Sequence, residues 1–364
     1  PSGLSGLTGR PCPVAVRAHA TVTFEAAKPG LVLPEAAPYT GRLHIRPIGI
    51  PAVARREHPA SYQMITKAIA GAFPEAAPGW HKGTAGAILI VGGSEGLTGA
   101  PHLAARAALR AGGGLISVTA PHGLCRDIKA DCPDIMTRAL GPAGNVRWSP
   151  ALLEELLPFL RQCGAMALGP GIGREPETAA FVQALLMCPS RPSAVVDADA
   201  LHALAMHPEA LSSLRACDVL TPHPGEAATL LHTTPALVQA DRFAALAGLR
   251  RLAPSVWILK GAGTLIGTEG QPVTIAPYAE PNLAVGGSGD VLSGCLGTLM
   301  AQTAAHPSEG CESSSFLAAC MGVHLHARAG RLLREAFPQR GNSATDIAEM
   351  LPRARIREAA GDGT

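Results

Sequence analysis

The stretch PNLAVGGSGDVLSG, residues 281–294, places four glycines around a single acid, Asp290, directly before an apolar run. The following residues carry apolar side chains at helical spacing, so we expect a helix to begin here. Glycine inside such an element costs about 0.5–1 kcal/mol relative to alanine, so the cluster indicates a close approach of the backbone to something else. Backbone N–H groups at a helix start form an anion site. Asp290 would repel the anion unless its carboxylate takes part in chemistry.

Outward from this stretch, apolar strands alternate with helices from about Gly83 onward. This rhythm predicts an α/β fold with a mostly parallel central sheet and helices on both faces. Ligands bind such sheets beyond the carboxyl ends of the strands. Five strands end in glycine, proline or polar residues, so we expect one site at that edge, built from Gly92-Gly93-Ser94, Gly169-Pro170-Gly171, Asp197 with Asp199, Thr221-Pro222-His223, and Lys260-Gly261.

The composition limits the classes of partner. The 364 residues are 47% hydrophobic, enough for a large core, and 30 basic residues nearly balance 28 acidic ones. This balance predicts neither a nucleic acid nor a membrane as partner. Nine cysteines without a CxxC pair are typical of free thiols in a reducing cytoplasm, a disulfide framework or metal site being the alternative. No apolar run approaches the roughly 18 residues of a membrane span, and no signal peptide is visible.

The chain divides into four segments. Residues 1–55 alternate like strands but lack a helix long enough to cover a sheet, so we expect an incomplete domain. Residues 56–80 are expected to form a linker and a short helix. Residues 81–352 carry the α/β domain, and residues 353–364 a solvated tail.

Three polar motifs leave alternatives open. Lys260 in KGAGT reaches a phosphate, or lies in an ordinary Lys-Gly turn. In LTPHPGE, His223 faces a ligand and Glu226 helps to hold a hydrated cation such as Mg²⁺, or the two belong to a rigid turn before a helix. Asp197 and Asp199 alternate, so both would point to one side of a strand end; they serve a site, or cap a helix.

Together the motifs predict a site that uses ATP or ADP. The sequence contains neither GxxxxGK[ST] nor a GxGxxG start with an acid about 20 residues on. Phosphoryl transfer needs positioning, charge neutralisation and an oriented nucleophile. We expect the glycines of GGSGD to present amides to phosphate. Asp290 would then act as a general base that removes a proton from the substrate hydroxyl.

The motif set, in order, resembles the ADP/ATP-dependent NAD(P)H-hydrate dehydratase family, within the ribokinase-like fold. The matching pieces span roughly residues 81 to 300 and read HKGTAGAILIVGGSEGLTGAP, RAGGGLISVTAP, DCPDIM, LGPGIG, VVDADAL, LTPHPGE, LKGAGTLI and NLAVGGSGDVLSG. Their order is far more specific than GGSGD alone, which many ribokinase-like kinases share.

The resemblance implies an activity and a set of site residues. The enzyme would convert hydrated NADH or NADPH back to NADH or NADPH: the nucleotide phosphorylates the hydrate's hydroxyl, and phosphate then leaves, giving AMP from ADP. Mg²⁺ and a homo-oligomer are implied, and ADP is favoured over ATP. The residues that match substrate contacts are Ala100, Gly171, His223 and Asp290. The residues that match nucleotide contacts are Lys260, Gly261, Ala262, Gly263, Thr264 and Gly289. Family members commonly have threonine where this chain has Val285.

Residues 1–55 resemble the closing segment of the NAD(P)H-hydrate epimerase domain, which precedes the dehydratase in many bacterial enzymes. The rest of that domain lies upstream of Pro1 in the family, so we expect no epimerase activity from this chain. Two other functions remain open for the main domain. One is a ribokinase-like kinase that phosphorylates the alcohol of a vitamin precursor. The other is a nucleotide sensor without catalysis.

Overall fold

The computed structural model describes the chain except for residues 66–68, 70–71, 75, 77, 306–313 and 356–364. A ten-stranded sheet has the order β3-β12-β11-β10-β9-β8-β7-β4-β5-β6, and β1 and β2 form a separate pair. The strands of the large sheet are β3 (Tyr62–Met64), β4 (Ala87–Val91), β5 (Leu115–Pro121), β6 (Met136–Leu140), β7 (Ala165–Leu168), β8 (Ser193–Val196), β9 (Val219–Leu220), β10 (Val256–Leu259), β11 (Thr264–Gly267) and β12 (Val273–Ala276).

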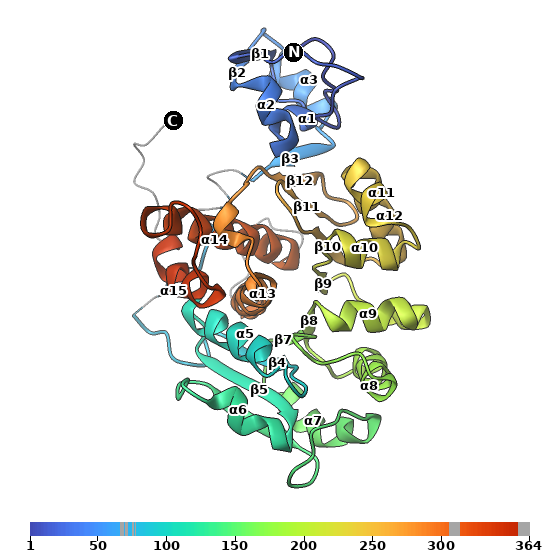
Figure 1. Ribbon diagram of the computed structural model, residues 1–364, viewed down its shortest axis with the longest axis vertical. Coiled ribbons are helices and arrows are strands. Elements are labelled where there is room, and N and C mark those ends of the chain that lie inside the picture. The colour runs from blue at the N-terminus through green and yellow to red at the C-terminus, as the bar shows by residue number, and fades with distance from the viewer. Residues whose placement is uncertain (66–68, 70–71, 75, 77, 306–313, 356–364) are drawn as a thin grey trace.

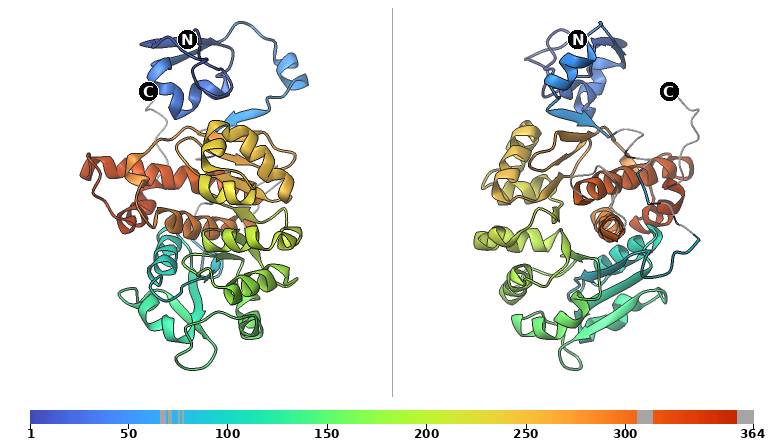
Figure 2. Two further views of the ribbon diagram at one scale, coloured as in Figure 1. Left: turned by 45° about the vertical axis from the view of Figure 1, so that its right-hand side comes forward. Right: turned by 180° about the vertical axis from the view of Figure 1, so that it is seen from behind.

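The sheet is mostly parallel, as predicted. Only the pairs of β11 with β10 and with β12 run antiparallel. Helices cover both faces, and Figures 1 and 2 show them as two layers. One layer contains α5 (Gly99–Arg110), α6 (Cys125–Lys129), α13 (Ser288–Ala305), α14 (Ser314–Ala336) and α15 (Ala344–Ala354). The other contains α7 (Leu153–Leu160), α8 (Pro176–Met187), α9 (Asp199–Met206), α10 (Pro224–Leu230), α11 (Pro235–Ala240) and α12 (Arg242–Leu252).

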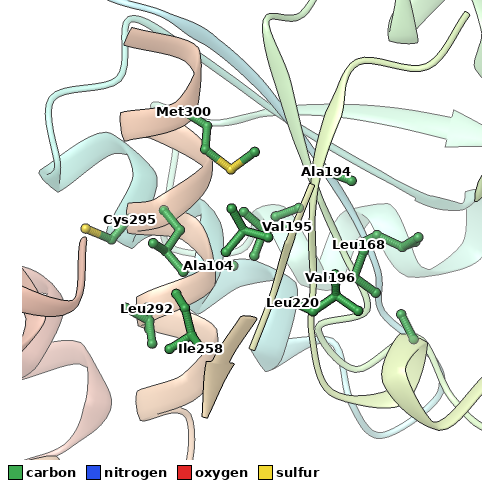
Figure 3. Packing of buried hydrophobic residues seen from close by; sticks show 14 of the residues in the cluster. Ala104, Leu168, Ala194, Val195, Val196, Leu220, Ile258, Leu292, Cys295 and Met300 are labelled. Carbon is green, nitrogen blue, oxygen red and sulfur yellow. The ribbon is translucent and has the colours of Figure 1, made fainter. Parts of the chain in front are cut away.

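The core lies between the sheet and α13, the helix predicted from the apolar run after Asp290. Figure 3 shows Met300 of α13 facing Val195 and Ile258 of the sheet, all three buried. Burying each such side chain contributes about 1.5–3 kcal/mol. Gly294 serves packing here, because a Cβ at this position would lie 1.9 Å from the carbonyl oxygen of Ala104 in α5. The glycine therefore lets the two helices approach closely.

The first residues form a small unit above the β3 end of the large sheet (Figure 1). Its parallel strands are β1 (Ala20–Phe24) and β2 (Arg42–Arg46), and its short helices are α1 (Pro29–Val32), α2 (Ala37–Thr40) and α3 (Ala52–Glu57). Nine large apolar side chains of this unit are exposed: Leu7, Val14, Val16, Val22, Phe24, Ile45, Ile48, Ile50 and Val53. Parallel strands are normally covered on both faces, so this unit presents an uncovered apolar surface.

The structure departs from the predicted organisation between residues 56 and 80. This segment, expected as a linker, contributes the edge strand β3, which pairs in parallel with β12. Three residues are too short for a strand to show a periodic pattern, which is why the prediction missed it. The short helix expected before the prolines of this segment lies outside the described residues, as does most of the expected tail. No helix within the described ranges has the length and apolarity needed to cross a bilayer.

Candidate active site

The five strand ends singled out from the sequence lie side by side. Their strands β4, β7, β8, β9 and β10 are consecutive neighbours in the sheet and parallel to one another. The carboxyl ends of these strands therefore meet at one edge. The glycine-rich start of α13 lies at the same edge, since Gly289 is close to the Lys260 ammonium that follows β10. The prediction of one composite site at this edge is confirmed.

The start of α13 combines an open turn with unused backbone donors. Gly287 has φ +86°, a conformation that other residues rarely adopt, and it turns the chain into the helix. The first N–H groups of a helix have no partner within the helix. An ideal Cβ on Gly289 would lie 3.5 Å from Lys260 Nζ and 3.7 Å from Asp197 Oδ2. A ligand at this helix start would therefore meet backbone amides and an ammonium together.

Asp290 lies in the first turn of α13 and is half-buried. Burial and the Asp197 carboxylate, with a smaller effect of Asp199, raise the pKa of Asp290 to about 7, although the Lys260 ammonium opposes them. Within the described part of the chain, no group donates a hydrogen bond to this carboxylate. Asp290 thus has a pKa suited to accepting a proton at neutral pH, and its oxygens remain available.

Lys260 is held by a buried ion pair. Its Nζ lies 2.7 Å from Asp197 Oδ1, and the other Asp197 oxygen accepts a 2.5 Å hydrogen bond from Ser293 Oγ. Burial would raise the pKa of Asp197, but Lys260 and the hydrogen bonds from Lys260, Ser293 and Thr221 outweigh it and hold the pKa below its usual value. Burial would lower the pKa of Lys260, but Asp197 and Glu226 outweigh it and raise that pKa. Both groups are therefore charged at neutral pH.

His223 and Glu226 form the turn that was one of the two interpretations of LTPHPGE. His223 is the N-cap of α10: its Nδ1 accepts from the amides of Gly225 and Glu226, and Glu226 Oε2 accepts from the His223 amide at 2.7 Å. Glu226 also lies 3.8 Å from Lys260 Nζ. Burial raises the pKa of Glu226 to about 7, against the effect of Lys260. The His223 side chain, 55% exposed, also borders the cavity described next, so the turn and the site coexist.

A cavity of about 830 Å³ opens beside these groups, between the β10–β11 turn, the start of α13 and α14. Of the residues predicted to contact nucleotide, Lys260, Gly261, Ala262, Thr264 and Gly289 line it. Gly263 does not; it is buried, and its amide donates to the Tyr278 carbonyl at 2.8 Å. The remaining wall is largely apolar and includes Leu283, Leu292 and Val323. The space combines a polar end with an apolar body, as small-molecule sites usually do.

Ala100 and Gly171, predicted to contact substrate, lie outside this cavity but next to each other. An ideal Cβ on Gly171 would be 3.0 Å from the Cβ of Ala100. One turn later in α5, Leu103 approaches Gly287, where a Cβ would lie 2.6 Å from the leucine side chain. Ala100 and Asp290 are thus connected through the contact of α5 with the start of α13. The predicted substrate residues flank the cavity from two sides.

Asp197 and Asp199 do not share an environment, contrary to the expectation from their alternation. Strand β8 ends at Val196, and Ala198 has φ +51°, so the strand geometry does not continue through them. Asp197 turns inward to Lys260. Asp199 accepts from the Gly173 amide at 3.2 Å and from Arg174 at 2.6 Å. One aspartate fixes the lysine, and the other fixes the loop after β7.

The described residues contain no group of three or more His, Cys, Asp or Glu side chains placed to bind a metal ion. Glu226 Oε2 is occupied by the His223 amide, while Oε1 has only His223 Nε2 at 3.4 Å. This donor set fits a hydrated Mg²⁺ that is held mainly by phosphates, as such ions usually are.

Comparison with known proteins identifies the family. The sequence profile of the NAD(P)H-hydrate dehydratases matches residues 88–353. The chain belongs to this family. It is 40% identical over 355 residues to the bifunctional NAD(P)H-hydrate repair enzyme of Moorella thermoacetica, and 32% identical over 353 residues to that of Escherichia coli. These matches include 97% of this chain but 65% and 64% of the relatives, so the chain spans just under two thirds of their length.

Solved structures confirm the fold expected of this family. A ribokinase-like protein from Enterococcus faecalis superposes with a TM-score of 0.67 at 21% identity, over 81% of this chain and 95% of that one. The ADP/ATP-dependent NAD(P)H-hydrate dehydratase of Bacillus subtilis, co-crystallised with ATP and Mg²⁺, superposes with a TM-score of 0.63 at 22% identity, over 80% and 96%. The α/β, ribokinase-like prediction is therefore confirmed.

Two histidines of α14 escaped the sequence analysis of this dehydratase-family chain. His326 lines the cavity and is hydrogen-bonded to Ser288 Oγ at 3.2 Å, and burial lowers its pKa to about 4, so the ring is neutral. His324 is hydrogen-bonded to the Tyr278 hydroxyl at 2.6 Å. Neither lies in a motif, and only the packing of α14 brings them to the site. Val285, the departure from the family's threonine, also lines the cavity, with an apolar side chain.

Proposed function

We propose that this chain catalyses the nucleotide-dependent dehydration of hydrated NADH and NADPH to NADH and NADPH, with ADP as the preferred phosphoryl donor. The observation that carries the proposal is the half-buried Asp290, whose pKa is about 7, at a glycine-rich helix start beside the Lys260 ammonium. Membership of the NAD(P)H-hydrate dehydratase family supports the substrate, and so do the names of the bifunctional repair enzymes that the chain resembles.

The proposed reaction assigns a role to each part of the site. Lys260 and the amides at the start of α13 bind the phosphates in the cavity, where positioning and charge neutralisation dominate catalysis. Asp290 accepts the proton of the hydrate's hydroxyl while that oxygen attacks the terminal phosphorus of the nucleotide. ADP then leaves as AMP. The phosphorylated hydrate loses phosphate from one ring carbon and a proton from its neighbour, which restores the dihydropyridine.

The remaining residues orient the two substrates. Ala100, Gly171 and His223 are proposed to contact the hydrated dinucleotide, and Gly261, Ala262, Thr264 and Gly289 the nucleotide. Glu226 would hold a water of Mg²⁺, which neutralises phosphate charge when bound. Gly263 acts through the backbone of its loop, because its own surroundings are protein atoms. We also propose a homo-oligomer in the cytoplasm, the latter from the eight free cysteines of the described residues.

For residues 1–55 we propose an incomplete epimerase-type unit that does not by itself epimerise the hydrate. The isolated parallel pair of β1 and β2 and the nine exposed apolar side chains of the unit support this. Further support comes from the match of 97% of the chain to bifunctional relatives. Appreciable interconversion of the two hydrate epimers by the purified chain would contradict the proposal.

One assay separates the proposed function from its two rivals. Purified chain, hydrated NADH, Mg²⁺ and either ADP or ATP are incubated, while the NADH absorbance and free phosphate are recorded. The dehydratase produces both signals in equal amounts. A kinase of a vitamin-precursor alcohol, or a nucleotide sensor, produces neither signal. Comparison of the rates with ADP and ATP tests the donor preference.

A further inference from the structure

Arg242 is the buried cation behind the loop that follows β10. It is the first residue of α12 and is 5% exposed. Within the described part of the chain, no carboxylate forms an ion pair with it. Burial lowers its pKa from 12.5, and the charge of Glu35 only partly opposes this effect. A buried guanidinium without a paired acid is costly unless its N–H groups are satisfied in another way.

The Arg242 guanidinium is satisfied by backbone carbonyls of a single loop. Its Nη1 donates to the carbonyls of Ala262 at 2.5 Å and Gly263 at 3.0 Å. Its Nη2 donates to the carbonyls of Leu259 at 3.1 Å and Lys260 at 3.5 Å. Hydrogen bonds that involve a charged group contribute about 1.5–3 kcal/mol each, roughly twice a neutral one. Arg242 is therefore the main cross-link of this loop.

These contacts decide which way the loop presents its donors. In a peptide unit the C=O and the N–H point in opposite directions, so the Lys260 carbonyl that faces Arg242 turns the next amide away from it. The amides of Gly261 and Ala262 have no acceptor within the described residues, and both residues line the cavity. Gly261 has φ +142°, which requires glycine, and an ideal Cβ there would approach Arg242 Nη2 to 3.2 Å.

The other side of the loop is closed by the N-terminal unit. A Cβ on Gly263 would lie 2.7 Å from Cδ of Pro34 and 3.2 Å from the Leu33 side chain. Arg10 of the same unit donates to the carbonyl of Gln239 in α11. The loop therefore has packed protein on the side away from the cavity, and without Arg242 its carbonyls have no other buried donor nearby.

We propose that Arg242 is a positioning residue for nucleotide binding: its guanidinium holds the carbonyls of residues 259–263 so that the Gly261 and Ala262 amides face the phosphates. It touches no substrate itself. The inference rests on the proposed use of a nucleotide at this cavity. It adds a structural cause for the geometry of the loop and a positive charge behind the phosphates.

The test measures the Kd of ADP and of ATP by calorimetry, without hydrate, for the wild-type chain and for Arg242→Lys and Arg242→Met. We expect Kd to rise at least tenfold for Arg242→Lys and further for Arg242→Met, because lysine has no planar fork for several carbonyls. Kd is normalised to the folded fraction from circular dichroism. With hydrated NADH, the KM for nucleotide should rise while the KM for hydrate changes less than threefold.

Arg191→Lys is the matched control. Arg191 is equally buried, at 3% exposed, but pairs with Asp218 at 2.6 Å before β8 and β9, at the edge opposite the site. It should lose stability with its nucleotide Kd within twofold of wild type. Folded Arg242 variants with Kd also within twofold would overturn the inference. A wild-type chain that binds nucleotide but produces no NADH would overturn the proposed function alone, and one that binds neither ADP nor ATP would overturn both.

Discussion

The ammonium of Lys260 lies 2.7 Å from Asp197, and the two side chains are only 18% and 2% exposed. Asp197 follows β8 and Lys260 follows β10, so the pair spans the intervening strand β9 at the edge where the candidate site lies. A buried pair of this kind contributes little net stability when it is complete. Its removal on one side is costly, because the other charge stays buried. The pair therefore fixes the position of Lys260 at the entrance of the cavity.

Replacement of Lys260 by methionine should lower the free energy of unfolding by about 3–5 kcal/mol, since Asp197 is left as an unpaired buried charge. The double variant Asp197→Asn, Lys260→Met should recover most of this loss, while nucleotide binding stays weak in both. Urea denaturation at neutral pH provides the free energies. If Lys260→Met alone unfolds with a free energy within 1 kcal/mol of wild type, the pair does not have the assigned role.

Gly263→Ala should weaken nucleotide binding. Its φ of +65° carries a strain of about 1–2 kcal/mol for any residue with a Cβ, and the new methyl group would meet Pro34 at 2.7 Å. Gly270→Ala is the matched control, because Gly270 has φ +74° but open space around it. We expect both variants to lose about 1 kcal/mol of stability and only Gly263→Ala to raise the nucleotide Kd, at least fivefold. Equal Kd values for the two variants would argue against the clamped loop.

Asp290→Asn should stabilise the chain at alkaline pH. The folded pKa of Asp290, about 7, lies above its unfolded value of 3.8, so the folded state holds this proton more tightly. The stability that this group contributes is fully present below pH 3.8 and is lost as pH rises through 7. Since each pKa unit is worth about 1.4 kcal/mol, the variant should gain up to about 4 kcal/mol at pH 8 and almost nothing at pH 4. Thermal melts at both pH values measure this difference.

The pH dependence of kcat/KM should show a rising limb near pH 7, because a general base must be deprotonated in the free enzyme. Asp290 and Glu226 both have raised pKa values of about 7, so both are candidates for this limb. Glu226→Gln separates them. The limb should persist in this variant if it belongs to Asp290, and a profile that becomes flat would assign the limb to Glu226 instead.

Much of the fold was predictable because the parallel strands are continuous apolar runs between helices. The strand β4 and the helix α5, for example, match AILIV and the run APHLAARAALR closely. The five polar strand ends could be brought together from the sequence because parallel strands share one carboxyl edge. The two antiparallel strands and β3 were harder, since β3 has three residues and its place depends on pairing with β12, far along the chain.

The site was predictable only where glycine or charge interrupts an apolar pattern. Lys260, Asp290 and the glycines around them stand out in this way. Arg242, His324 and His326 do not, because each is a single polar residue in a helix with no fixed spacing to the motifs it supports. The positive φ of Ala198, which separates Asp197 from Asp199, is a property of the folded turn and has no signature in a single sequence.

The central claim is that Asp290 is the general base, and the turnover of Asp290→Asn with hydrated NADH and ADP tests it most directly. General base catalysis contributes about 10²–10⁴-fold, so the rate of NADH formation should fall by at least two orders of magnitude while the ADP Kd stays within threefold of wild type. A variant that is folded, binds ADP as the wild type does and still forms NADH at a rate within tenfold of it would contradict the account.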